Sequence, residues 1–507
     1  MTHTVFIEVG PLQEIRYAGI SNVTLNLCRY WLQQPGEACR FFLGPYLIER
    51  GAIEAVVEAR SGGLFQMLLM NRQAIAGFVD NEVGRFAKSV GLFPNAKSIE
   101  GTFDLAFQIV HDISFLLTSE FHHADTLAYH GLTILRDLAS NARTFCVSHA
   151  TASDLSAYLG VPAERITVSH PGAEPEAEIE RYLGHLPPAE PTRPYIVVPG
   201  TIEPRKNIDL VLLGLQRVPQ LLARYDWVFI GSPGWLIAFD DRIAQYGLTE
   251  RYRSGAIKWL GYVDEYQKAF LYRHAELAIY PSFFEGFGIP VAEAMYFGCP
   301  VVCSYSSGIP EAGGNAAFYF DPTSILSFER MLLLALRQTR LDRKMVREAS
   351  RLQALRLTWD DFARRIDETI RSTVAEITPQ PADRSSDRLN PIVGFQEAFT
   401  EAQVKEKPSV GGHFDLINQL DHLRREEVLR IGKIAAGLLP RFGPVVAVGF
   451  LYYELLGRPP NDVESSRQAH RLRQSPSATP AIIEELLGSA DPHQDVVLPA
   501  RAPGSSA

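Results

Sequence analysis

Short apolar runs alternate with longer stretches of helical periodicity through the first half of the chain. The predicted elements of this half are strands at Val5–Val9, Phe103–Val110 and Thr144–Val147 and a helix at Gly19–Leu32. Strands that alternate with helices are typical of parallel βαβ units. His111-Asp112 and Ser148-His149 directly follow two of the strands. Open α/β sheets bind ligands at the carboxyl ends of their strands, so these polar residues are predicted to face a binding cleft.

A proline-rich connector interrupts this alternation and marks a domain boundary. Residues 186–194 contain four prolines, which continue neither a helix nor a central strand. The alternation then restarts, with strands at Tyr195–Pro199, Trp227–Ile230, Ala256–Leu260, Leu277–Tyr280 and Pro300–Cys303 and helices from Asn207, at Glu265–Arg273 and at Ile289–Phe297. The expected fold class is α/β, with two tandem Rossmann-like, doubly wound domains at residues 1–188 and 189–355 that face a cleft.

The C-terminal part of the chain has a different pattern. Residues 375–391 are polar and Pro-rich, and we expect them to form a linker. Leu416–Leu439 and Pro444–Leu456 have helical periodicity, so residues 392–490 are predicted to form a small α-helical accessory module. Residues 491–507 are predicted to be a disordered tail.

Composition and charge narrow the class of protein. The chain has 507 residues, of which 46% are hydrophobic and 21% charged, as in ordinary multidomain globular proteins. Its formal net charge of −9 argues against a nucleic-acid partner, which would require a basic face. The five cysteines are scattered, and no pair of Cys or His with zinc spacing accompanies Cys299 and Cys303. Buried free thiols and no metal ion are therefore predicted.

Membrane and export signals are absent from the pattern. The first residues lack a basic segment that is followed by a long apolar run, so no signal peptide is predicted. No stretch approaches the roughly 18 uncharged apolar residues that cross a bilayer. We expect a cytoplasmic protein whose membrane contact, if any, is peripheral to the inner face.

The segment that begins at Pro281 carries the strongest indication of chemistry. A strand ends at Pro281, a glycine-flanked turn carries Glu285, and a helix begins near Pro290. The free N–H groups of Gly286–Gly288 lie at the positive end of this helix, where they can bind anions and hydroxyls. Glu285 and Glu293 are eight residues apart, and carboxylates accept hydrogen bonds from sugar and ribose hydroxyls.

A second candidate site follows the first strand of the second domain. Arg205 and Lys206 lie in its βα loop, where two cations can neutralise a diphosphate and stabilise its departure. An isolated Arg-Lys pair is more often a solvated basic pair, so the assignment depends on its neighbours.

These segments together resemble the family 4 retaining glycosyltransferases of the group 1 type, which have the GT-B fold. Glu285 and Glu293 match the family's signature of two glutamates separated by seven residues. The resemblance implies that Glu285 contacts hydroxyls of the donor sugar, that Gly286, Phe287 and Gly288 hold the sugar through their backbone, and that Glu293 binds the nucleotide ribose. It also implies that Lys206 binds the diphosphate. Thr201 stands where the family commonly has an Arg, so Arg205 is a candidate substitute.

Further residues match family landmarks in the expected order. Gly19 lies in a loop that resembles the family's diphosphate-binding first loop, and His111 resembles a histidine near donor sugar and acceptor. The loops that contain Gly308 and Glu311, and Tyr262 and Val263, would border the site. For Glu311, helix capping and ligand contact remain alternatives. The resemblance also implies that a helix at about residues 356–374 packs back on the first domain.

The resemblance implies a metal-independent enzyme in which Glu285, His111 and Lys206 have catalytic roles. It would move a sugar, with mannose from GDP-mannose as the first candidate and a UDP-sugar as the second, to a glycan or lipid-linked glycan in bacterial surface polysaccharide synthesis. No cofactor is expected, and no residue stands out as a covalent nucleophile, which favours same-face attack by the acceptor.

Two other functions remain to be compared with this one. A dehydrogenase would need a Gly-x-Gly-x-x-Gly segment after a strand, which the sequence lacks. A non-catalytic nucleotide-sugar or glycan-binding scaffold is the main alternative, because Thr201 departs from the family pattern. The segment Leu451–Pro460 resembles a helical module that is appended to bacterial surface-polysaccharide enzymes. Membrane or protein contact, if it occurs, is expected through this module.

Overall fold

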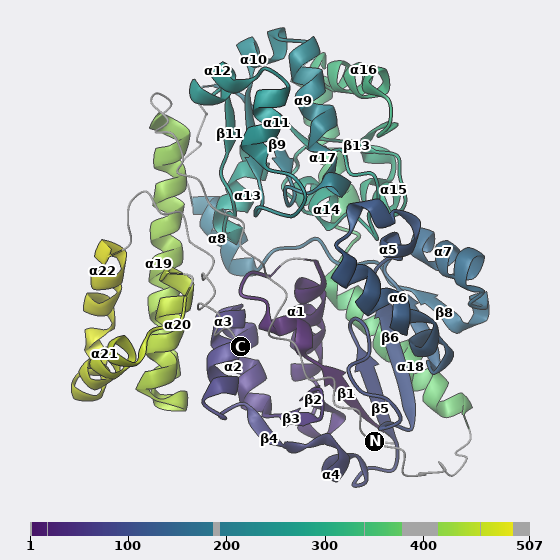
Figure 1. The fold of residues 1–507 in the computed structure, drawn as a ribbon, viewed down its shortest axis with the longest axis vertical. Helices are drawn as coiled ribbons and strands as arrows, with labels where there is room; N and C mark the ends of the chain where they lie inside the picture. The colour runs from purple at the N-terminus through teal and green to yellow at the C-terminus, as the bar shows by residue number, and fades with distance from the viewer. Residues whose placement is uncertain are drawn as a thin grey trace, which may run out of the picture.

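The computed structural model describes residues 3–17, 19–185, 193–338, 340–377, 414–456 and 458–489. Two α/β domains lie one above the other, and the C-terminal helices run along one side of both (Figure 1). Most of the predicted linker at 375–391, the first part of the module and the predicted tail at 491–507 lie outside the described residues. None of the helices within these ranges is long and apolar enough to cross a membrane.

The first domain contains an eight-stranded sheet with the order β4-β3-β2-β1-β5-β6-β7-β8. Its strands are β1 Thr4–Glu8, β2 Cys39–Leu43, β3 Tyr46–Ile48, β4 Ile75–Phe78, β5 Ser89–Phe93, β6 Leu105–Val110, β7 Arg143–Cys146 and β8 Ile166–Val168. The pairs are parallel, as predicted, except that β3 pairs antiparallel with β2 and β4. Only Gly44 and Pro45 separate β2 from β3, and so short a connection forms a hairpin, whereas a parallel crossover needs about a dozen residues.

The second domain contains a six-stranded sheet with the order β11-β10-β9-β12-β13-β14. Its strands are β9 Tyr195–Pro199, β10 Asp226–Ile230, β11 Ile257–Trp259, β12 Leu277–Tyr280, β13 Val301–Ser304 and β14 Phe318–Phe320. All its pairs are parallel. The strand order reverses between β9 and β12, which is where doubly wound sheets form a ligand crevice.

Helices connect and cover both sheets. Those of the first domain are α1 Gly19–Leu32, α2 Arg50–Ala59, α3 Gly62–Met70, α4 Val79–Val83, α5 Ser114–Leu117, α6 Ala124–Ala139, α7 His149–Leu159 and α8 Ala177–His185. Those of the second are α9 Ile208–Arg217, α10 Gln220–Arg224, α11 Phe239–Gln245, α12 Thr249–Arg253, α13 Glu265–His274, α14 Ile289–Tyr296, α15 Ile309–Gly313, α16 Ile325–Leu336 and α17 Arg340–Ala354. All five cysteines are buried and unbridged.

The chain then returns to the first domain and continues into the C-terminal helices. Helix α18, Trp359–Glu376, lies against α1. Ser169 Oγ donates to the Phe362 carbonyl at 3.0 Å, and Tyr30 donates to Asp367 at 3.1 Å. The C-terminal helices are α19 Phe414–Phe442, α20 Pro444–Leu456, α21 Asp462–Gln474 and α22 Thr479–Ser489. Their apolar side chains belong to the same continuous core cluster as those of the first domain.

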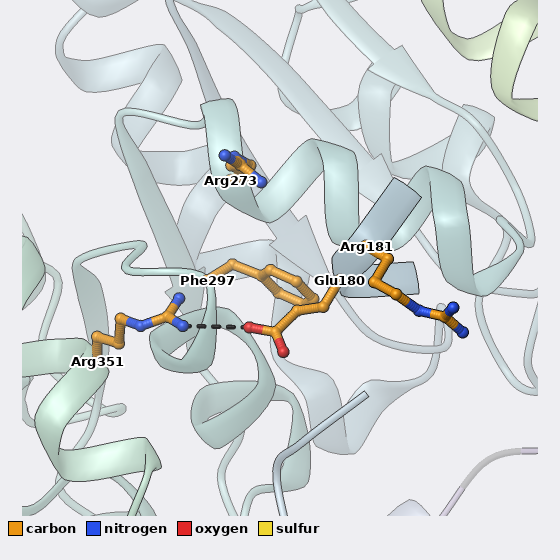
Figure 2. A pocket seen from close by; sticks show the side chains of 5 residues that line it. All are labelled: Glu180, Arg181, Arg273, Phe297 and Arg351. Carbon is orange, nitrogen blue, oxygen red and sulfur yellow. Dashed lines mark hydrogen bonds and ion pairs between the residues drawn. The ribbon is translucent and has the colours of Figure 1, made fainter. Parts of the chain in front are cut away.

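A cavity of about 470 Å³ lies where the end of the first domain meets the second (Figure 2). It is lined by Glu180, Arg181, Arg273, Phe297 and Arg351, which belong to α8, α13, α17 and the end of α14. Arg351 donates to Glu180 at 3.1 Å and to the Tyr296 carbonyl at 3.3 Å. Arginines stabilise the negative ends of helices, so this lining has a structural role at the carboxyl end of α14.

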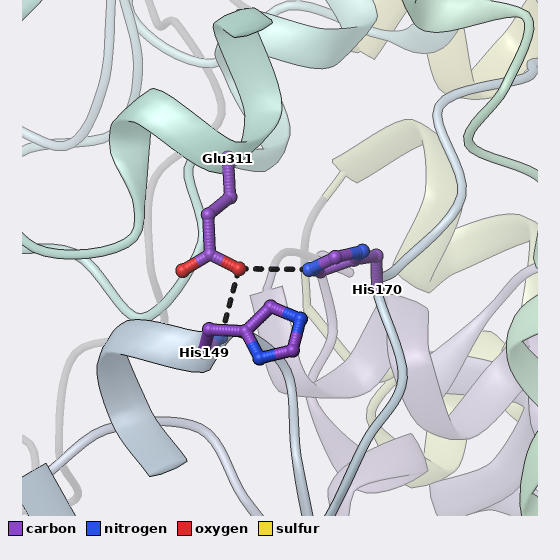
Figure 3. Close-up of side chains that lie close together, drawn as sticks. All are labelled: His149, His170 and Glu311. Atoms are coloured by element: carbon purple, nitrogen blue, oxygen red, sulfur yellow. Dashed lines mark hydrogen bonds and ion pairs between the residues drawn. The ribbon is translucent and has the colours of Figure 1, made fainter. Parts of the chain in front are cut away.

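Glu311 of α15 in the second domain contacts the first domain at the start of α7 (Figure 3). Its carboxylate accepts the backbone N–H groups of His149 at 2.7 Å and Ala150 at 2.8 Å, and His170 Nε2 lies 2.8 Å away. Burial would raise the pKa of Glu311, but the hydrogen bonds from His170 and the two amides lower it. Glu311 therefore acts as a capping residue, and it caps α7 of the first domain rather than its own helix.

We expect Leu212→Ala to destabilise the second domain by about 2–5 kcal/mol. Leu212 is fully buried on α9 in the core of that domain, so its removal leaves a cavity. Leu326→Ala on α16 is the matched control, since Leu326 is 66% exposed. The free energy of unfolding in urea measures both changes, and equal losses would contradict the assignment of the core.

We expect Glu311→Gln to weaken the domain contact by about 1–3 kcal/mol at pH 7, because hydrogen bonds to a charged acceptor are lost. The folded pKa is lowered from the ordinary 4.5, so the charge stabilises the fold above that value and its contribution is lost as pH falls through the folded pKa. Calorimetric melting of parent and variant from pH 7 to pH 3.5 should show their difference shrinking. A difference that does not change with pH would contradict this role.

Candidate active site

The loop after β9 carries two cations toward the loop after β12. A 3₁₀ turn at Pro204–Lys206 leads into Asn207, whose φ of 53° begins α9. Asn207 Nδ2 donates to the Pro281 carbonyl at 3.1 Å, which ties the two loops together. Arg205 and Lys206 are therefore held at the switch point of the second sheet.

The Glu285 carboxylate forms ion pairs with both Arg205 and Lys206. Lys206 Nζ lies 2.7 Å from Glu285 Oε1, and Arg205 Nη1 lies 2.9 Å from Glu285 Oε2. Lys206 also donates to the Tyr280 hydroxyl at 2.9 Å, and Arg205 donates to Glu203 at 2.8 Å. Glu203 and Glu285 are buried, so each charge in the cluster is compensated by an opposite one.

The electrostatics of the cluster keep Glu285 ionised. Burial would raise its pKa, but the charges of Arg205 and Lys206 outweigh burial and hold the pKa at about 2. Burial likewise opposes the charge on Arg205, but Glu285 and Glu203 raise the pKa of the guanidinium. The Glu285 carboxylate therefore acts only as a hydrogen-bond acceptor at neutral pH.

Three backbone amides lie beside this carboxylate. The N–H groups of Gly286, Phe287 and Gly288 donate to no atom of the described residues. Gly288 has a φ of 103° and is the N-cap of α14, with Pro290 in the first turn. Free amides at a helix N-terminus bind anions and hydroxyl oxygens.

Close backbone packing requires glycine at two positions of the site. A Cβ at Gly286 would lie 2.1 Å from the His111 carbonyl oxygen of the first domain. A Cβ at Gly308 would lie 2.1 Å from the Gly286 carbonyl oxygen. Both contacts are too short for any side chain. Gly286 therefore allows the two domains to meet at this point, and Gly308 allows two loops of the second domain to pack against each other.

His111 forms the wall of the site in the first domain. Its Nε2 lies 2.8 Å from the Pro94 carbonyl, which only accepts, so Nε2 carries the proton of the neutral ring. Burial lowers the pKa of His111 despite the hydrogen bond to Pro94 and the charge of Asp112. The His111 carbonyl accepts from Thr151 at 2.9 Å. The ring is therefore neutral at pH 7, and its Nδ1 carries no proton.

Glu293 belongs to a different cluster of charges from Glu285. It accepts from Lys268 of α13 at 2.8 Å, and Lys268 also lies 3.0 Å from Glu265. Burial opposes the charge on Lys268, but these two carboxylates raise its pKa. Glu293 lines a narrow cleft between the domains, together with Asn22, Asn26, Arg60, Gly172, Ala173, Glu174, Pro175, Glu265, Lys268, Ala269, Phe297 and Trp359.

The other predicted site residues lie at the margins. Gly19 begins α1 with a φ of 42°, and Thr201 is half-buried in the loop after β9. The Tyr262 ring has the Arg16 guanidinium 4.5 Å from its centroid, and Val263 packs against the main core cluster. These four residues share no hydrogen bond, ion pair or ring contact with Arg205, Lys206 or Glu285.

Sequence reasoning missed three residues that hold the site together. Tyr280 and Glu203 bind the two cations, and the Ser307 hydroxyl accepts the Glu285 N–H at 2.8 Å. The available signals were weak: Tyr280 is a tyrosine at the end of an apolar strand, and Glu203 lies two residues before Arg205. The partners of Tyr280 and Ser307 lie in other loops, so local sequence does not indicate them; the pairing of Glu203 with Arg205 is local but is common in loops without any function.

One group of side chains among the described residues has the composition of a metal site. The ligand atoms of His149, His170 and Glu311 lie within 4.8 Å of one another. Both oxygens of Glu311 already accept hydrogen bonds, and they do so at the positive end of α7. The observed geometry is that of a helix cap.

Comparison with known proteins gives the family of the second domain. Residues 187–352 match the family model described as glycosyl transferases group 1. The chain is 32% identical over 257 residues to the O-antigen chain mannosyltransferase B of Escherichia coli, an alignment that covers 50% of this chain and 66% of that relative. It is 26% identical over 264 residues to the serotype-specific mannosyltransferase WbdA of Escherichia coli, covering 50% of this chain and 32% of WbdA.

The fold has known counterparts as well. Sucrose-phosphate synthase from Thermosynechococcus elongatus superposes with a TM-score of 0.51 at 15% identity, covering 74% of this chain and all of that structure. The chain spans less than two thirds of the lengths of these curated relatives. Its two α/β domains have the fold of the sucrose-phosphate synthase structure, and residues 187–352 are a glycosyl transferases group 1 domain.

Proposed function

We propose that the chain is a retaining, family 4 glycosyltransferase that moves a sugar from a nucleotide diphosphate-sugar to a glycan or lipid-linked glycan. The observation that carries the proposal is the cluster in which Arg205 and Lys206 meet Glu285 beside the free amides of Gly286–Gly288. Two cations, a carboxylate and free N–H groups in one place fit a ligand with a diphosphate at one end and hydroxyls at the other.

In this proposal the diphosphate shares the two cations that Glu285 holds in the free protein. Lys206 lies between Glu285 and Tyr280, and Arg205 lies between Glu285 and Glu203. When the diphosphate arrives, the two cations neutralise it and stabilise its charge as it leaves. Arg205 thus supplies the second positive charge in a chain that has Thr201 at the usual Arg position. No metal ion is needed for that purpose.

The carboxylate and the amides then face the sugar. In the free protein the two cations hold the pKa of Glu285 at about 2, and in this proposal they stay beside the carboxylate and keep it ionised while they bind the diphosphate. Glu285 then accepts hydrogen bonds from sugar hydroxyls, and the N–H groups of Gly286–Gly288 donate to sugar oxygens. Glu293 is proposed to bind the nucleotide ribose, which requires it to exchange its contact with Lys268. Gly19 and Gly308 would line the diphosphate and sugar, and the backbone near Tyr262 and Val263 would lie beside the base.

The proposed transfer retains the anomeric configuration without a covalent intermediate. The acceptor hydroxyl attacks the anomeric carbon on the face from which the diphosphate leaves, the carbon–oxygen bond to the diphosphate breaks, and the departing oxygen takes the acceptor's proton. Lys206 stabilises the charge on that oxygen. The neutral His111 ring orients sugar and acceptor, since its unprotonated Nδ1 can accept a hydroxyl hydrogen bond.

Mannose is the first sugar to test, because the two Escherichia coli relatives are named as mannosyltransferases, one of them of the O-antigen chain. GDP-mannose is therefore the first donor and a UDP-sugar the second, in bacterial surface polysaccharide synthesis. A cytoplasmic location at the inner face of the membrane fits this role, and a net charge of −9 fits the absence of a nucleic-acid partner.

A non-catalytic scaffold that binds a nucleotide sugar or a glycan is the second candidate. Thr201 favours it, because a neutral side chain stands where the family usually has a cation. Donor binding without transfer to any acceptor would support this alternative.

We expect Lys206→Ala to weaken donor binding by about tenfold to a hundredfold, since a charge-assisted phosphate contact contributes on the order of 1.5–3 kcal/mol. Calorimetry with UDP-, GDP-, ADP- and dTDP-sugars in the presence of a chelator measures the change. Lys344→Ala, on the exposed surface of α17, is the matched control. A loss below about twofold would reject the diphosphate role, and binding of no donor by the parent would reject the proposed function.

We expect the transferred sugar to keep the anomeric configuration that it has in the donor. NMR of the product formed from the donor that binds would give the configuration from the one-bond coupling between C1 and H1, which distinguishes the anomers of mannose as well as those of glucose. Mass spectrometry of the protein after incubation with donor alone should detect no added sugar. An inverted product would contradict retention, and an adduct on Glu285 would contradict same-face attack.

A further inference from the structure

The C-terminal helices are packed tightly onto α3 of the first domain. A Cβ at Gly63 of α3 would lie 2.5 Å from Tyr453 Cβ of α20, and a Cβ at Gly449 of α20 would lie 2.2 Å from Met67 Cε. The Tyr453 hydroxyl also donates to Gln66 Oε1 at 3.3 Å. In both places a side chain of one helix packs directly against the backbone of the other, as in a close-packed interior.

Glu454 extends this interface to the first turn of α3. The Ser61 hydroxyl is the N-cap of α3, where its oxygen accepts the Leu64 N–H at 3.0 Å, and its O–H donates to Glu454. Burial raises the pKa of Glu454 to about 7, although Ser61 and Arg430 act in the opposite direction. Arg430 of α19 pairs with Glu427 at 2.7 Å.

The other face of α3 holds the loop between β1 and α1. A Cβ at Gly62 would lie 1.8 Å from the Glu14 carbonyl oxygen, and Gln66 Nε2 donates to the Gln13 carbonyl at 2.7 Å. This loop carries Arg16 over the Tyr262 ring of the second domain at 4.5 Å and leads into Gly19. Gln66 therefore contacts both the module and the loop.

Helix α19 touches the second domain on the same side. It packs against α13, which carries Lys268 and Glu265, and against α2 of the first domain. The charge of Arg430 acts on Glu265, and that of Glu427 acts on Asp264. The module thus contacts both domains, and in the second domain it packs against α13, whose Lys268 holds the proposed ribose ligand Glu293.

We propose that the C-terminal helices α19–α22 are a buttress of the donor site, in which Tyr453 and Glu454 hold α3 against the β1–α1 loop and so fix the position of that loop. Tyr453 and Glu454 are positioning residues, since neither touches Arg205, Lys206 or Glu285. The proposed function supplies only the identity of the ligand near this loop, a nucleotide diphosphate-sugar. The contacts that hold the loop do not depend on it.

The experiment uses the full chain and follows amide hydrogen exchange of residues 12–17 without any ligand. Gly449→Leu displaces the Met67 side chain of α3 that packs against α20, and Glu454→Leu removes the acceptor of the Ser61 hydroxyl. Both should speed exchange of the loop about tenfold, as expected when a contact that stabilises it by about 1.4 kcal/mol is lost. Glu454→Gln keeps an acceptor for Ser61 and should restore the parent exchange.

A matched control separates the buttress from general loosening of the module. Glu464→Gln breaks the ion pair with Arg458 at 2.7 Å within the module and leaves the contact with α3 intact, so exchange of residues 12–17 should not change. If Gly449→Leu exposes the amides of α20 while residues 12–17 stay protected, the inference is overturned. If Glu454→Leu and Glu464→Gln act equally on the loop, it is also overturned.

Donor binding provides the second measurement. For the nucleotide-sugar that the parent binds in calorimetry, Glu454→Leu should raise Kd by about three- to tenfold, and Glu454→Gln should not. An unchanged Kd in the presence of a loosened loop would overturn the link to the donor site. If the parent binds no nucleotide-sugar, the proposed function fails, and the exchange measurement alone still decides whether the module holds the loop.

Discussion

The candidate site depends on one interaction, the burial of Glu285 between Lys206 and Arg205. An unpaired carboxylate at this depth would take up a proton or leave the interior, because burial strongly disfavours its charge. The two cations reverse that preference and hold the pKa of Glu285 at about 2. The same pairing holds two positive charges at the switch point of the second sheet, and the proposed function assigns these charges to the diphosphate of the donor.

The contact between the domains is built around this cluster. Gly286 lies next to Glu285 and packs against the His111 carbonyl, so the carboxylate from one domain and the histidine from the other belong to the same wall. Glu311 adds a cap that crosses from the second domain to α7 of the first. Domain contacts of this kind fix the distance between a donor side and an acceptor side, which positions two reactants.

The C-terminal helices α19–α22 also contact both domains, although none of their residues belongs to the cluster around Glu285. Their apolar side chains continue the core of the first domain, and their polar residues reach Ser61 of α3 and the carboxylates of α13. A second connection between the domains therefore lies opposite Glu311. Because both connections involve polar groups with specific partners that are at least partly shielded from solvent, they favour one relative position of the domains over alternatives.

The sequence by itself determined the class of fold, the positions of more than half of the strands and of some helices, and three residues of the cluster, Arg205, Lys206 and Glu285. Strands β9 and β12 and helices α1 and α20 have the residues that the apolar pattern predicted, because periodicity and turn residues act locally. Tertiary structure alone decided the partners: Lys206 meets Glu285 across 79 residues, Glu293 meets Lys268 rather than the same cluster, and Glu311 caps a helix of the other domain. Those contacts depend on the order of strands in the sheets and on the approach of the domains, which local patterns do not encode.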